Sequence, residues 1–250
     1  MMKLLKYDFK RNGAKLLGIG AVLILAQISM MLFIENTEIT LVLSALAYVI
    51  AGVILFTTTI RTYSYNIKAY HRKLLPVHTL KSILSPIIMG GICMLILSLV
   101  FTIHGFVFLS IQGELEAIKE LFRMYPTDTI MSVLSVFWMV VHVLIVIFLA
   151  VTISTSIRSK GSFWIGIVAF FLIVNGLAWI ENRLFGDSEW GMFRILVGES
   201  DTVANGISTK VNSSPVYFSW EFIGTFVFEL GCSLAFLYIM VKLIDRKVEA

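Results

Sequence analysis

Several polar side chains lie inside long apolar stretches of this 250-residue chain, and they are the first candidates for chemistry. Glu229 lies near the middle of the stretch 217–243, and Thr225 and Ser233 lie four residues on either side of it. A four-residue spacing puts these three side chains on one face of an α-helix. Strongly polar side chains in such surroundings are costly, so by default they are candidates for a functional site.

Two further polar residues lie at a similar depth in other apolar stretches. His142 and Asn175 each lie about 13 residues into their stretch, which is near the midplane of a membrane for a span of about 20 residues. We therefore expect that both can meet Glu229. Two interpretations remain: a buried polar cluster that only fixes helix packing, or a part of a substrate path or an interface between subunits.

The chain lacks the sequence motifs of common catalytic sites. It has no GxxxxGK[ST] sequence that would bind the phosphates of ATP, and no HExxH or GxSxG sequence. Its two cysteines, Cys93 and Cys232, lie in apolar stretches without CxxC or Cys/His spacing, so neither a metal site nor a disulfide framework is predicted. We expect that the chain is not an enzyme and that it holds no metal or cofactor.

The composition indicates the elements that must position these side chains. The chain is 58% hydrophobic and 14% charged, with a mean hydropathy of +0.90, whereas soluble domains have about a quarter of charged residues. A membrane-spanning helix needs about 20 apolar residues. The sequence therefore predicts an all-α membrane protein, one transmembrane domain over 1–250 with six spans, near 16–34, 40–60, 82–111, 129–152, 162–180 and 217–243.

The basic residues predict the orientation of these spans. The segments 1–15, 61–81, 153–161 and 242–250 hold 15 of the 20 Lys and Arg residues, and the opposite side holds 12 of the 16 acidic residues. Lys and Arg accumulate on the cytoplasmic side of membrane proteins. We expect a multi-pass protein of the cell membrane, with both termini and 61–81 in the cytoplasm and an extracellular loop over 181–216.

The first segment, "MMKLLKYDFKRNG", is too polar to span a membrane. At helical spacing its apolar residues share one face and its lysines another: Met1, Met2, Leu5 and Phe9 against Lys3, Lys6 and Lys10, with Arg11 following. A basic amphipathic helix of this kind lies in the membrane interface and is attracted to anionic lipid headgroups. We expect an interfacial helix over 1–14, and the alternative is a topology signal alone.

The stretch "AYHRKLLPVHTLK", residues 69–81, places a small apolar group in a basic loop after the second span. The residues in question are Arg72, Lys73, Leu74, Leu75, Pro76, Val77 and His78. Proline fixes the backbone bend, the aliphatic side chains offer an apolar contact, and the basic residues suit an acidic partner. Positive charge that serves only the topology is the alternative interpretation.

Three segments together resemble the ABC-2 type permeases, the membrane subunits of a class of ABC transporters. They are "LLKYDFKR" at 4–11, "KLLPVHTLKSILSP" at 73–86 and "KLIDRKVEA" at 242–250. Six spans in 250 residues also match, so the resemblance covers the whole chain. The sequence departs from the family at His78, where a small hydroxyl residue is common.

The resemblance implies a function for the basic loop. In such permeases the loop after the second span forms a coupling helix that docks on a separate ATPase subunit, and that subunit binds ATP and Mg. It further implies a second permease, identical or related, and ATP-driven export of an amphipathic peptide, antibiotic or lipid-like substrate. Permeases of this size resemble peptide and antibiotic exporters of Gram-positive bacteria, and phenol-soluble modulin exporters are one such group.

Two other functions remain compatible with the sequence. A proton-coupled secondary transporter would use Glu229 as its proton carrier and would need no ATPase. A membrane sensor or assembly protein would transport nothing. The copurification of an ATPase subunit would separate the permease hypothesis from both, and nothing in the sequence indicates a nucleic-acid partner.

Overall fold

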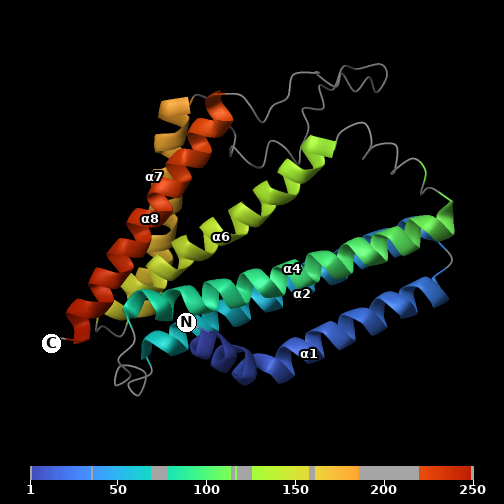
Figure 1. Cartoon of the computed structure of the whole chain (residues 1–250), viewed down its shortest axis with the longest axis horizontal. Helices are drawn as coiled ribbons and strands as arrows, with labels where there is room; N and C mark the ends of the chain where they lie inside the picture. The colour runs from blue at the N-terminus through green and yellow to red at the C-terminus, as the bar shows by residue number, and fades with distance from the viewer. Residues whose placement is uncertain are drawn as a thin grey trace. The chain divides into compact units, whose positions relative to one another are not determined.

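The computed structural model describes residues 2–34, 36–68, 78–113, 116, 126–157, 161–185 and 220–248. Every long regular element in these ranges is an α-helix (Figure 1). The helices are α1 (Met2–Phe33), α2 (Thr37–Lys68), α4 (Thr79–Gln112), α6 (Pro126–Ser156), α7 (Ser162–Phe185) and α8 (Trp220–Val248). The all-α class predicted from the sequence is confirmed over the described ranges.

All six helices are long and apolar enough to cross a membrane, so the prediction of a multi-pass membrane protein is confirmed at that level. Each helix contains all or most of one predicted span. The helices α1 and α2 have 32 residues each, which makes them about 48 Å long at 1.5 Å per residue. Because the hydrocarbon core of a bilayer is about 30 Å thick, both helices must tilt or extend beyond it.

The helices form two compact units, one within Met1–Glu120 and one within Leu121–Ala250. In unit 1 the helices α1, α2 and α4 all pack against one another. In unit 2 the helix α6 packs against both α7 and α8. Several buried polar side chains lie inside these three-helix units.

The apolar core of unit 1 explains where the N-terminal segment lies. Leu55, Met89 and Cys93 form one buried cluster, and Leu5 and Phe9 pack against it. Of the apolar face that the sequence assigned to lipid, Leu5 and Phe9 therefore contact the protein itself, whereas Met2 is exposed. α1 is also one continuous helix without a break between the predicted interfacial helix and the predicted span, although its first turns run at an angle to the rest (Figure 1).

A close approach of α2 and α4 lies near the centre of unit 1. A Cβ atom on Gly90 would lie 2.8 Å from Cγ2 of Thr59, which is closer than real Cβ atoms come to a neighbour. One turn earlier, the fully buried Pro86 stands inside α4 and has no N–H to donate to the carbonyl of Ser82. Gly90 and Pro86 thus form part of the α4 surface on which α2 packs.

The core of unit 2 is dominated by the second half of α6. Its buried residues are Leu144, Ile145, Val146, Phe148, Leu149 and Ala150, and Met240 adds a fully buried side chain from α8. These residues cover more than one face of α6, which fits a helix that packs against two neighbours. Gly224 of α8 lies directly against the ring of Phe185 of α7.

Local hydrogen bonds fix three helix ends. Asn36 caps α2, because its Oδ1 accepts hydrogen bonds from the N–H groups of Glu38 at 3.0 Å and Ile39 at 3.2 Å. His78 precedes α4, and its Nδ1 accepts from the N–H of Leu80 at 3.2 Å. Gly113 ends α4 with a φ of 78°, a conformation that glycine adopts without strain.

Candidate functional site

Two hydrogen bonds join α6 and α8 in unit 2. The indole Nε1 of Trp138 donates to Oε2 of Glu229 at 2.7 Å. One turn further along both helices, Nδ1 of His142 lies 2.8 Å from Oγ of Ser233, and the tautomer of the imidazole decides which atom donates. Because both helices advance by four residues between the two contacts, α6 and α8 run in the same direction.

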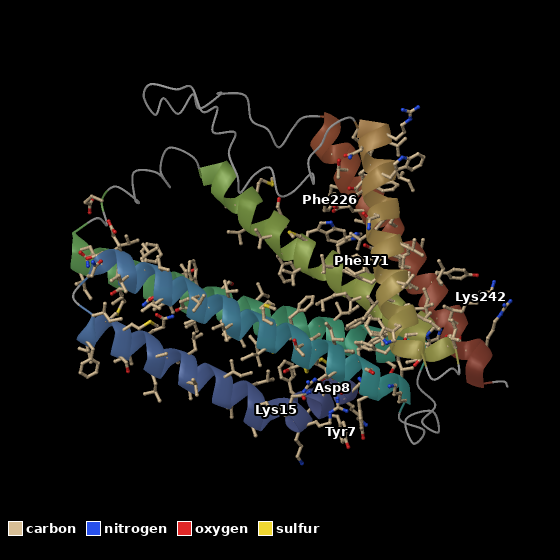
Figure 2. The ribbon with its side chains drawn as sticks, turned by 180° about the vertical axis from the view of Figure 1, so that it is seen from behind. Tyr7, Asp8, Lys15, Phe171, Phe226 and Lys242 are labelled. Atoms are coloured by element: carbon tan, nitrogen blue, oxygen red, sulfur yellow. The ribbon has the colours of Figure 1, made fainter. Side chains whose placement is uncertain are left out.

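Aromatic rings and a second carboxyl group surround this pair of contacts. The ring of Trp138 packs against Phe226 at 5.1 Å between centroids and against His142 at 6.4 Å, and Figure 2 marks Phe226 on α8. Glu181 of α7 lies near enough for its charge and that of Glu229 to act on each other. The three helices of unit 2 thus bring two carboxyl groups, an indole and an imidazole together.

Thr225 and Ser233 lie on the same helix face as Glu229 and are buried, with 3% and 4% of their surfaces exposed. The polar stripe that the sequence predicts along this helix therefore points into unit 2. His142 joins it through Ser233. These four candidates from the sequence, Glu229, Thr225, Ser233 and His142, lie together along the contact between α6 and α8.

Asn175 is not part of this cluster. Its side chain is exposed, and its Nδ2 donates a 2.7 Å hydrogen bond to the carbonyl of Phe171 on its own helix. The sequence allowed Asn175 to meet Glu229, and the structure does not bring the two together. The position of a residue along a span gives its depth but not the side of the helix on which it lies. Whether two residues at similar depth meet depends on whether both lie on the sides of their helices that face each other.

The chemistry open to the cluster is proton exchange and the binding of positive charge. Carboxyl and imidazole groups both take up and release protons, and a carboxylate beside aromatic rings attracts a cationic group. The same contacts also hold α6 against α8. Among the described residues, no three His, Cys, Asp or Glu side chains gather in a way that would hold a metal ion.

A second polar cluster lies in unit 1, and the sequence did not indicate it. Asp8 is fully buried, and its Oδ2 accepts a 2.7 Å hydrogen bond from Oγ of Ser85. Asn66 donates from Nδ2 to the same carboxylate, at 3.3 Å to Oδ2. Asn12, one turn after Asp8, donates from Nδ2 to Oγ1 of Thr62 at 2.9 Å.

One sequence signal could have found this cluster. Polar residues four apart occur at Asp8 and Asn12 on α1 and at Thr62 and Asn66 on α2, and all four are buried. Such pairs place two polar groups on one helix face. In the opening segment, the lysines were the stronger pattern and concealed the pair on α1.

The basic residues proposed to contact lipid divide into two groups. Lys3, Lys6 and Lys10 are exposed, and so is Lys15, which in Figure 2 points away from the neighbouring helices while Asp8 lies among them. Arg11 instead turns toward α2. Its guanidinium lies 4.1 Å from the ring centroid of Tyr65, and its Nη1 donates to Oδ1 of Asn66 at 3.5 Å.

Most residues of the proposed coupling segment lie outside the described residues. These are Arg72, Lys73, Leu74, Leu75, Pro76 and Val77. His78 is described as the exposed cap of α4, and Lys81 is exposed in the first turn of that helix. The larger part of the loop predicted over 181–216 also lies outside the described residues.

Comparisons with protein-family models, with curated proteins and with solved structures found no match for this chain.

Proposed function

We propose that this chain is the membrane subunit of an ATP-driven exporter of the ABC-2 type. In this proposal it pairs with a second permease, identical or related, and with separate ATPase subunits that bind ATP and Mg. The substrate class is an amphipathic peptide, antibiotic or lipid-like molecule. The chain lies in the cell membrane with both termini in the cytoplasm.

The observation that carries the proposal is a basic surface at one end of unit 1. The contacts of Asp8 with Asn66 and Ser85 place the start of α1, the end of α2 and the start of α4 beside one another. The exposed basic residues of these three helix segments are Lys6, Lys10, Lys15, Arg61, Lys68 and Lys81. Basic residues on the helices that precede and follow 69–77 in the sequence suit a docking site for an acidic protein partner.

The six apolar helices support a transport function, since they supply the multi-pass membrane domain that a permease needs. The basic residues at the start of α1 also suit anionic lipid headgroups. Together with the missing ATP-binding motif in the chain, these features favour a membrane subunit that depends on an ATPase partner.

Copurification tests the proposal directly. A tagged chain is expressed in its native host and extracted in mild detergent, and an ATPase subunit is expected to copurify. Replacement of Leu74 and Leu75 by Asp should abolish copurification and leave the chain in the membrane, because the loss of a central apolar anchor costs about 2 kcal/mol or more.

A matched control places two Asp residues at Ile111 and Gln112, which are exposed at the other end of α4. This control adds the same charge and should retain the ATPase. If no ATPase subunit copurifies with the parent chain, or if the Leu74 and Leu75 variant retains it fully, the proposal is wrong.

A proton-coupled transporter is the second candidate, and the carboxyl group of Glu229, which Trp138 holds between α6 and α8, favours it. A carboxyl group within the span region provides a site where a proton is carried. Transport that continues after the ATPase partner is deleted, and that a proton uncoupler stops, would establish this function instead.

A further inference from the structure

Asp8 connects three helices through its carboxylate. Ser85 of α4 donates to Oδ2 at 2.7 Å, and Asn66 of α2 donates to Oδ2 at 3.3 Å and to Oδ1 at 3.5 Å. The Asp8 side chain is fully buried. Burial of a carboxylate costs free energy unless hydrogen bonds satisfy its oxygens. The structure is therefore most stable when Ser85 and Asn66 keep their positions beside Asp8.

The same three helices are connected again one turn away. Asn12 donates from Nδ2 to Oγ1 of Thr62 on α2 at 2.9 Å, and the same nitrogen lies 3.7 Å from Sδ of Met89 on α4. Two successive layers of contacts along α1 therefore reach both neighbours. Two layers resist rotation of the N-terminal segment as well as its separation from α2 and α4.

Charge adds to this attachment. Asp8 is the one carboxylate at this end of unit 1 within the described residues, and the helix segments that it joins carry exposed lysines and Arg61. A negative charge in a low-dielectric interior interacts more strongly with surrounding positive charges than it would in water. Where the Asp8 carboxylate is ionised, it therefore offsets the mutual repulsion of the basic residues on these three helices.

Asn66 and Ser85, which both donate to Asp8, lie near the ends of their helices. Asn66 lies in the last turn of α2, and Ser85 lies in the second turn of α4. These are the two helix ends that flank residues 69–77. A force on either helix end therefore acts on Asp8, and through it on α1.

We propose that Asp8 is a positioning residue that joins the N-terminal turns of α1 to both helix ends flanking 69–77, so that the three move as one body. The mechanical consequence rests on the proposed function: movement imposed by an ATPase partner would reach the span of α1 through Asp8. The attachment itself is independent of any partner.

A distance measurement on the full-length chain tests the attachment. Spin labels are placed on Lys6→Cys and Lys81→Cys, both exposed positions, in a Cys93→Ala, Cys232→Ala background in lipid nanodiscs. Pulsed electron paramagnetic resonance should give a narrow distance distribution for the parent. Asp8→Ala should broaden it, and Lys10→Gln, an exposed charge change one half-turn away, should leave it narrow.

Ser85→Ala provides a second test that keeps the carboxylate. It removes the 2.7 Å hydrogen bond from Ser85 to Asp8 and should also broaden the distribution, to a smaller extent. If Asp8→Ala does not accumulate in the membrane, Ser85→Ala decides the question. A distribution that stays as narrow as that of the parent in the deciding variant overturns the proposal.

Transport then tests the mechanical consequence. Ser85→Ala and Asp8→Asn, which keeps the side-chain shape, should copurify an ATPase subunit like the parent and lose transport. Normal transport in a variant with a broadened distribution would refute the coupling through Asp8. If the parent copurifies no ATPase subunit, the proposed function fails, and the distance measurement still decides the attachment.

Discussion

Trp138 donates a 2.7 Å hydrogen bond to Glu229 across 91 positions of the sequence. The bond joins α6 to α8 and gives the carboxyl group a fixed neighbour in the span region. The effect of a substitution at Glu229 on stability should therefore depend on the residue at position 138, and the reverse should also hold.

Replacement of Glu229 should separate packing from charge. Glu229→Gln keeps an oxygen that accepts from Trp138, whereas Glu229→Leu leaves the half-buried indole N–H without this acceptor. A fully buried donor without a partner costs about 1–3 kcal/mol, which sets the upper bound for this loss. We expect Leu to lower the melting temperature of the purified protein more than Gln. A transport defect in the Gln variant with unchanged assembly would assign Glu229 to the substrate path.

Trp138→Phe supplies the control for this pair. The phenylalanine has no donor, so the cost of Glu229→Leu should shrink in the Trp138→Phe background. Hydrogen bonds between membrane helices average about 0.6 kcal/mol in double-mutant cycles and reach about 1.7. Fully additive effects in a thermal-denaturation cycle would contradict a direct bond between the two side chains.

The contact between Gly90 and Thr59 predicts a sharp difference between two glycines. Gly90→Ala should destabilise the protein, because its Cβ would lie 2.8 Å from Cγ2 of Thr59 and overpacking costs about 1–3 kcal/mol. Thr59→Ala should restore much of the loss by removing the atoms in contact. Gly105→Ala meets no atom within 4 Å and should be neutral or stabilising in a thermal unfolding assay.

The stacking of Arg11 on Tyr65 predicts that two neighbouring basic residues differ in effect. Arg11→Gln removes a cation–π contact of 4.1 Å, which is worth about 0.5–1 kcal/mol at exposed sites. Lys10→Gln removes a charge from an exposed side chain and should cost less. Equal melting temperatures for the two variants would show that the stacking contributes no stability.

The orientation of the chain is testable with single cysteines. In a Cys93→Ala, Cys232→Ala background, an impermeant thiol reagent added to intact cells should label Ser200→Cys and leave Lys68→Cys unlabelled. The reason is the accumulation of basic residues on the side that contains 61–81. Permeabilised cells provide the control, and labelling of position 68 in intact cells would reverse the topology.

The sequence predicted the helices well because their signal is local. Long apolar stretches indicate spans without any knowledge of neighbours, and the helix that contains Glu229 was located by this means. The spacing of Thr225, Glu229 and Ser233 also identified the buried face of α8. Periodicity states which residues share a face, and a buried polar stripe stands out against apolar surroundings.

The contacts between helices were less accessible to sequence reasoning. Asn175 and His142 lie at similar depths, and only the packing of α7 and α6 decides that one is exposed and the other bonded to Ser233. Asp8 was hidden for a different reason. Its partners lie 58 and 77 positions away, so its burial depends on a tertiary arrangement that no local pattern records.

The two hydrogen bonds between α6 and α8 are four residues apart on both helices. This equal spacing affects how strongly the bonds fix the axial register of the two helices. A slide of α8 by one turn, about 5.4 Å, would bring Thr225 or Ser233 opposite Trp138, and either hydroxyl can accept from the indole. Hydrogen bonding alone therefore permits more than one register between these helices. The ring of Phe226 against Trp138 at 5.1 Å, together with the large side chains around it, distinguishes the observed register from its neighbours.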